Sequence, residues 1–157
     1  MNNVFLGQPD EEIKKWFVET FPPWPTYTTL EFVDGTTQTK EISGTVTWKN
    51  IGVKSTPTLY NNTLKSCQLG KKVTEISGWT FAGCFSLTSV NIPNSVTSIG
   101  DSAFNICSSL TPVNIPNSVT SIGNLAFHKC YSLSSINIPN SVISIGNNAF
   151  KNCESLK

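Results

Sequence analysis

Charged side chains are scarce in this sequence, and long apolar runs are absent. Asp, Glu, Lys and Arg make up 13% of the 157 residues, and the formal net charge is only +1. An average soluble protein has about 25% charged residues. Nucleic acids are bound largely through Lys and Arg that neutralise phosphates, so we expect no nucleic-acid partner. No stretch approaches the roughly 20 apolar residues of a membrane-spanning helix, so we expect no membrane insertion.

The first ten residues lack the features of a secretory signal. They read Met-Asn-Asn-Val-Phe-Leu-Gly-Gln-Pro-Asp, with no basic residue and no long apolar core. A signal peptide has both. This absence keeps a cytoplasmic or a virion-associated location open.

Side chains suited to catalysis or to metal binding are equally sparse. His128 is the single histidine, and it lies beside Lys129 with no candidate nucleophile or carboxylate near it in sequence. The cysteines are Cys67, Cys84, Cys107, Cys130 and Cys153. The last four recur at one long interval instead of in the close pairs of a zinc site, which predicts a row of buried free thiols. We therefore expect no metal, no cofactor and no enzyme activity.

Repetition is what the sequence has in abundance. The hexapeptide Asn-Ile-Pro-Asn-Ser-Val begins at Asn91, Asn114 and Asn137, a period of 23 residues. A longer frame, Leu-x-x-Val-x-Ile-Pro-x-x-Val-x-x-Ile-Gly-x-x-Ala-Phe-x-x-Cys, has the same period. Its copies begin at Leu64, Leu87, Leu110 and Leu133, and the first copy is the weakest. A fixed period of this length is typical of stacked repeat architectures.

Within one repeat, apolar residues alternate with polar ones. Leu87, Val90 and Ile92 are expected to point inward from a short strand, while Ser89 and Asn91 point outward. The next residues, Pro-Asn, predict a turn, and a second short extended segment follows it.

The glycine after that second segment, Gly100 in one repeat, is expected to adopt a backbone conformation that other residues resist. One repeat has too few apolar residues to fold alone. Stacked repeats would share a continuous core, with backbone hydrogen bonds between coils about 4.8 Å apart.

The frame resembles the BspA-like, or Treponema-pallidum-type, class of leucine-rich repeats over residues 63–157. The resemblance implies a repeat solenoid, a right-handed coil with short parallel strands, built from about four 23-residue repeats. It also implies a bacterial or protist protein of the cell surface or extracellular space. Such a protein would be a non-catalytic protein-binding or adhesion module whose partner is a host or cell-surface protein.

Residues 1–62 do not follow the repeat and predict an N-terminal α+β cap of one helix and a β-hairpin. An apolar stripe predicts the helix from Glu11 to Phe21. Strands are expected from Thr26 to Val33 and from Thr36 to Ile42, because the Asp34-Gly35 pair between them is a hairpin signal. We expect a further strand from Gly44 to Trp48.

This region has two interpretations. Solenoids need polar-faced ends, which favours a cap that shields the first coil. The tryptophans Trp16, Trp24 and Trp48 are numerous for a cap alone, which favours an attachment module. In that case the chain would be a structural or assembly subunit, such as an accessory protein of a phage tail or a surface appendage, docking through residues 1–62. An intracellular adaptor or inhibitor is a further alternative.

Three sets of residues are candidates for a binding surface. The row Asn91, Asn114 and Asn137 on the strand face is small, neutral and flat, which suits a carbohydrate or lets the amides bond along the row. Two other columns hold larger side chains beside the convex side of the coil, and we favour these. Their aromatic and aliphatic members are Phe85, Tyr131, Trp79 and Leu125.

The last residues start another repeat at Leu156. An uncovered coil exposes strand edges that can pair with another chain. The sequence therefore also predicts self-association, with a second copy of the chain as partner.

Overall fold

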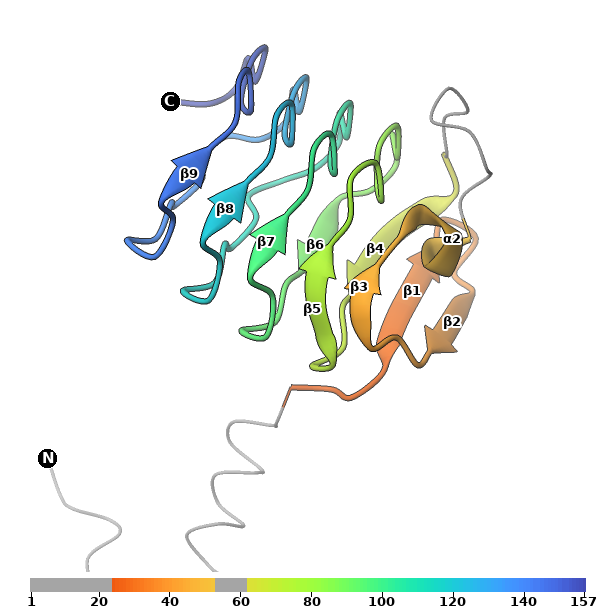
Figure 1. Ribbon diagram of the computed structural model, residues 1–157. Coiled ribbons are helices and arrows are strands. Elements are labelled where there is room, and N and C mark those ends of the chain that lie inside the picture. The colour runs from red at the N-terminus through yellow and green to blue at the C-terminus, as the bar shows by residue number, and fades with distance from the viewer. Residues whose placement is uncertain (1–23, 53–61) are drawn as a thin grey trace, which may run out of the picture.

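The computed structural model describes residues 24–52 and 62–157. Figure 1 shows successive coils stacked side by side along one axis, with short strands in register from coil to coil. The predicted repeat solenoid with short parallel strands is therefore confirmed. The predicted helix from Glu11 to Phe21 lies outside the described residues.

One parallel sheet is formed by the second extended segment of each repeat. Its strand order is β3-β5-β7-β8-β9, and every neighbouring pair is parallel. The strands are β3 (Gly44–Val46), β5 (Val73–Ile76), β7 (Ser98–Ile99), β8 (Ser121–Ile122) and β9 (Ser144–Ile145). The strand expected from Gly44 is thus the first member of this sheet.

A second sheet is mixed and has the order β2-β1-β4-β6. Its strands are β1 (Thr28–Phe32), β2 (Thr37–Lys40), β4 (Leu64–Gln68) and β6 (Ser89–Asn91). β1 and β2 form the antiparallel hairpin that the Asp34-Gly35 pair predicts, and β1 also pairs with β4. A single helical turn, α2 (Trp48–Ile51), follows β3 and begins in a capping box between Thr47 and Asn50. Of these elements, β1, β2 and α2 lie at one end of the stack (Figure 1).

The second sheet stops at β6 although every repeat carries the same frame. Beyond β6, the corresponding described segments pair only through one isolated bridge between Asn114 and Asn137. Pro112 occupies the centre of the third segment and has no N–H for a ladder. One proline thus explains why a strand predicted for each repeat is reduced to a bridge.

The core consists of columns of identical side chains. The rings of Phe81, Phe104, Phe127 and Phe150 stack with centroids 5.1, 5.0 and 5.4 Å apart and nearly parallel planes. Leu87, Val90 and Ile92 are buried as predicted, while Ser89 and Asn91 point outward. The rings belong to one continuous hydrophobic core, against which Phe150 packs partly buried.

The cysteines form the predicted row of buried free thiols. The thiol of Cys107 donates to the carbonyl of Phe81 at 3.1 Å, and Cys130 and Cys153 donate to Phe104 and Phe127 at 3.2 and 3.0 Å. Burial raises the pKa of the Cys84 and Cys130 thiols to about 12. The thiols therefore stay protonated at neutral pH.

The expectation for the repeat glycine is wrong, and the structure shows a different reason for it. Gly100, Gly123 and Gly146 are not in the left-handed region. A Cβ built on Gly123 would lie 2.5 Å from the backbone nitrogen of Asp101 in the preceding coil. Glycine is required because neighbouring backbones approach closely at this position.

The residues with a left-handed backbone conformation lie a few positions after the repeat glycine in each coil, and most of them are not glycine. Their φ angles are 64° at Trp79, 56° at Ser102, 57° at Leu125 and 58° at Asn148. A second such column, four residues on, contains Gly83, Ile106, Lys129 and Asn152. A left-handed conformation costs an L-residue about 1–2 kcal/mol. Inter-coil backbone bonds hold these turns: Trp79 N–H, for example, donates to the Asp101 carbonyl at 3.0 Å.

This difference between the two positions predicts opposite responses to substitution. Gly123→Ala is expected to lower the free energy of unfolding by about 2 kcal/mol, because the new methyl group overlaps the preceding coil. Lys129→Gly is expected to leave that free energy unchanged or raise it by up to about 1 kcal/mol, since glycine relieves the left-handed strain. Urea denaturation followed by circular dichroism measures both. Equal losses in the two variants would contradict this explanation.

Thiol alkylation tests the buried cysteine row. In the folded protein at neutral pH, iodoacetamide should leave four cysteines unmodified and modify Cys153 slowly, because Cys153 is 9% exposed and the others less. The reactive species is the thiolate, which burial disfavours. In denaturant all five should react at the same rate. Mass spectrometry of peptides gives the rates, and rapid alkylation of Cys107 in the folded state would refute the assignment.

Candidate functional site

The favoured aromatic candidates lie in the turns that lead from the parallel sheet to the second sheet. Trp79 is 43% exposed and Tyr131 is 37% exposed. Phe85 and Leu125 are half-buried. The sequence gives the positions of these side chains in the repeat, and the structure shows that two of them present large rings to solvent.

Other residues lie between the candidate members of each column. Trp79 and Leu125 are two repeats apart, and the buried Ser102 occupies the coil between them. Phe85 and Tyr131 are also two repeats apart, with Ser108 between them. The four side chains are therefore separate contact points on one scaffold.

Trp79 is held in a rigid turn on both sides. Its N–H donates to the Asp101 carbonyl at 3.0 Å, and its own carbonyl accepts from the Ala82 N–H at 3.2 Å. Its φ of 64° is uncommon for a bulky residue. The exposed indole thus projects from a backbone that cannot relax without breaking the stack.

The asparagine row is exposed, as its outward position predicts. Asn91, Asn114 and Asn137 are all exposed, and Asn91 Nδ2 donates to Gln68 Oε1 at 2.9 Å. Asn114 and Asn137 are bridge partners in the ladder. For Asn91, the interpretation that the amides bond along the row fits this hydrogen bond.

A groove that was not predicted from the sequence runs along the parallel sheet. It has a volume of about 450 Å³ and crosses β7, β8 and β9. Its lining is Ser98, Ile99, Gly100, Asp101, Ser121, Ile122, Gly123, Asn124, Ser144, Ile145 and Gly146. The repeated tetrapeptide Ser-Ile-Gly-Asp or Ser-Ile-Gly-Asn is the signal that marks it, because the glycine places no side chain between two polar positions.

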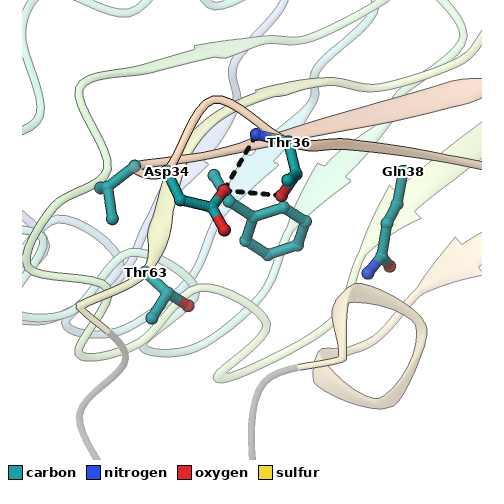
Figure 2. Close-up of a pocket in the computed structure, with 6 residues that line it drawn as sticks. Asp34, Thr36, Gln38 and Thr63 are labelled. Carbon is teal, nitrogen blue, oxygen red and sulfur yellow. Dashed lines mark hydrogen bonds between the residues drawn. The ribbon is translucent and has the colours of Figure 1, made fainter.

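A second hollow, of about 290 Å³, lies beside the hairpin turn (Figure 2). Asp34 Oδ1 accepts hydrogen bonds from the backbone N–H of Thr36 at 2.9 Å and from its hydroxyl at 2.6 Å. The Thr36 hydroxyl, followed by its N–H, lowers the pKa of Asp34. Gln38 and Thr63 complete the wall that Figure 2 shows. The carboxylate is engaged in fixing the turn, which is a structural role.

His128 has an amide as its polar partner. Its Nδ1 lies 2.9 Å from Asn105 Oδ1. Partial burial, then the positive charges of Lys129 and Lys151, lower the pKa of His128. The ring is thus largely neutral at neutral pH and oriented by an amide, an arrangement that activates no nucleophile.

Metal-binding clusters and membrane-spanning helices are absent from the described part of the chain. Residues 24–52 and 62–157 contain no group of three His, Cys, Asp or Glu side chains that could hold a metal ion. In the same residues, no helix has the length and apolar character needed to cross a membrane.

Comparison with known proteins agrees with the architecture. Residues 34–157 match the BspA type leucine rich repeat region, in six copies. This match begins in the hairpin turn, upstream of the predicted boundary at residue 62, and β3 already pairs with β5. The division into residues 1–62 and 63–157 stays a prediction.

Two solved structures are similar to this chain. A leucine-rich repeat protein of T. pallidum is 36% identical, with a TM-score of 0.56, over 58% of this chain and 42% of that one. A leucine-rich repeat protein from Bacteroides ovatus is 28% identical, with a TM-score of 0.50, over 82% of this chain and 39% of that one. The chain thus spans less than half the length of either structure.

No curated protein matches the sequence significantly. The repeat frame, the stacked parallel strands and a family match over residues 34–157 agree with one another. The chain belongs to the BspA type leucine-rich-repeat family.

Proposed function

We propose that the chain is a non-catalytic protein-binding module that acts in adhesion at a cell surface. The observation that carries this proposal is the exposure of two large aromatic side chains, Trp79 and Tyr131, on a rigid repeat scaffold. Trp and Tyr are enriched among the residues that dominate protein interfaces. Among residues 64–157, Trp79 and Tyr131 are the exposed aromatic side chains, and most of the other exposed residues there are polar.

The scaffold supports this function energetically. Binding loses affinity when side chains and loops must be ordered at the interface. The turn of Trp79 is already fixed by its bonds to Asp101 and Ala82, and Tyr131 directly follows the buried Cys130. Both rings are thus presented by ordered backbone. The family resemblance supports a host or cell-surface protein as the partner and a surface location.

A protein array tests the binding function. The labelled chain, incubated with an array of purified extracellular-matrix and cell-surface proteins, is expected to bind at least one of them saturably. Trp79→Ser and Tyr131→Ser should each weaken that binding about 30-fold, which corresponds to about 2 kcal/mol for a hot-spot residue. Asn117→Ser, at an exposed turn position elsewhere on the coil, is the matched control. Binding that both aromatic substitutions leave intact would overturn the proposal.

Assembly into a larger structure is the second candidate function. Trp24 and Tyr27 are also exposed, although Trp24 Nε1 donates to the Leu69 carbonyl at 2.6 Å. These rings favour docking through residues 1–62, as for an accessory subunit of a phage tail or appendage. A second feature, Ile143, is 86% exposed in an outward column whose earlier members are Thr97 and Thr120. This exposed apolar side chain, with Ile145 nearby also 48% exposed, favours contact with another copy of the chain.

Light scattering over a concentration series tests self-association. The wild-type mass is expected to rise with concentration, and Ile143→Thr should shift the rise to higher concentration, because it restores the polar residue of the column. Thr120→Ser, in the preceding coil, keeps a hydroxyl and serves as control. A constant monomer mass for the wild type would remove self-association as a function.

A further inference from the structure

The groove on the parallel sheet is lined by two polar rows and a glycine floor. Ser98, Ser121 and Ser144 are in register on β7, β8 and β9 and form one row. Asp101 and Asn124 follow the glycines and form the other row. The groove runs across three coils, parallel to the axis of the stack.

The serine row differs from the neighbouring hydroxyl columns in having no internal partner. Ser95, Ser118 and Ser141 each donate to a carbonyl of the preceding coil at 2.6–2.7 Å. Thr97 and Thr120 donate similarly at 3.3 and 3.2 Å. Among the described residues, the hydroxyls of the groove row make no hydrogen bond to the protein. These hydroxyls therefore remain available as donors and acceptors to a ligand.

The opposite row is oriented by the stack itself. Asp101 Oδ1 accepts from the Asn124 N–H at 2.8 Å, and Asn124 Oδ1 accepts from the Asn147 N–H at 2.7 Å. Each side chain is held in place by the hydrogen bond that its Oδ1 accepts. The second carboxylate oxygen of Asp101 and the amide N–H groups of Asn124 have no described partner. An acceptor and a donor thus face the groove from adjacent coils in fixed orientation.

The glycines of the floor cannot be replaced without disrupting the fold. A Cβ on Gly100, Gly123 or Gly146 would come within about 2.5 Å of the backbone of the preceding coil. The stacking of the coils therefore excludes side chains from these floor positions. The groove has a volume of about 450 Å³ and is largely open to solvent.

The chemistry of the lining selects among ligand classes. No Lys or Arg lines the groove, and the Asp101 carboxylate would repel an anion, which disfavours phosphorylated or sulfated ligands. Ile99 and Ile122 are buried beneath the floor, so Ile145, which is 48% exposed, is the only exposed apolar side chain of the lining. One such side chain is too little for an apolar peptide. The other exposed groups are hydroxyl, amide and carboxylate groups, and these complement the hydroxyls of a sugar.

We propose that this groove binds a neutral oligosaccharide lying along the solenoid axis. Successive coils present the same serine about 4.8 Å apart, so a chain of repeating sugar units would meet a repeating set of partners. Neither Trp79 nor Tyr131 lines the groove, so this proposal does not depend on the protein-binding function.

Titration with soluble neutral hexasaccharides, followed by nuclear magnetic resonance of ¹⁵N-labelled protein, tests this proposal. The probes are the glucose, mannose, xylose and N-acetylglucosamine hexamers at millimolar concentration. At least one is expected to shift the amide signals of β7, β8 and the Gly-Asn pair after β8 in a saturable way. Absence of shifts with all four probes, or shifts located outside the groove, would overturn the proposal.

Substitutions separate a groove-bound sugar from a sugar bound elsewhere. Ser121→Val should weaken binding about tenfold, because it removes a hydroxyl partner and adds bulk to the wall. Asn124→Asp should also weaken it, because the Oδ1 acceptor for Asn147 is retained while the amide donor is lost. Ser135→Val, an exposed position in the last repeat outside the groove, should have no effect, and circular dichroism checks that all variants fold. Unchanged affinity in Ser121→Val and Asn124→Asp would refute the site.

Trp79→Ser distinguishes the two proposals. It should leave sugar affinity unchanged, since Trp79 does not line the groove. Loss of sugar binding in the folded Trp79→Ser variant would contradict the groove as the sugar site. Its effect on protein binding bears only on the adhesion proposal.

Discussion

The close approach of successive backbones is the constraint on which the rest of the structure depends. Each coil bonds to the next through strand ladders and through turn bonds such as Phe81 N–H to the Ala103 carbonyl at 2.8 Å. This contact fixes glycine at Gly100 and Gly123, where a methyl group would overlap the neighbouring coil. It also stabilises the left-handed turn of Leu125, because leaving that conformation would forfeit the inter-coil bonds. Stacking therefore determines both where glycine is required and where its absence is tolerated.

The same constraint accounts for the low charge of the sequence. Residues of one column lie opposite each other on neighbouring strands, where like charges repel. Repeating a Lys or an Asp in every coil would build a ladder of one sign. Ser, Thr and Asn avoid this, and many also bond to the preceding coil, as Thr111 Oγ1 does to the Thr88 carbonyl at 2.8 Å. A composition with only 13% charged residues thus follows from the stacking of near-identical repeats.

The sequence was sufficient to predict the parts of the fold that depend on side-chain pattern. The alternation around Leu87 and Val90, the buried thiols and the hairpin at Asp34-Gly35 all follow from periodicity and local turn chemistry. It was insufficient for features that depend on the distance between coils. The reason for the repeat glycine and the groove beside Asp101 required the stacked backbones to be in place. Pro112 combines both kinds of feature. Its missing N–H can be read from the sequence, but the loss of strand pairing beyond β6 is seen only in the structure.

The two proposed surfaces differ in how they relate to the repeat. Ser98 recurs as Ser121 and Ser144, so the groove offers the same group in each coil. Trp79 becomes Ser102 in the next coil, so the exposed indole is unique in its column. A periodic surface matches a periodic ligand, whose units can bind in several equivalent registers. A unique aromatic anchor on the same rigid stack fixes one register, as recognition of a folded protein requires. Conserved columns and departures from them can therefore serve different partners without competing for the same residues.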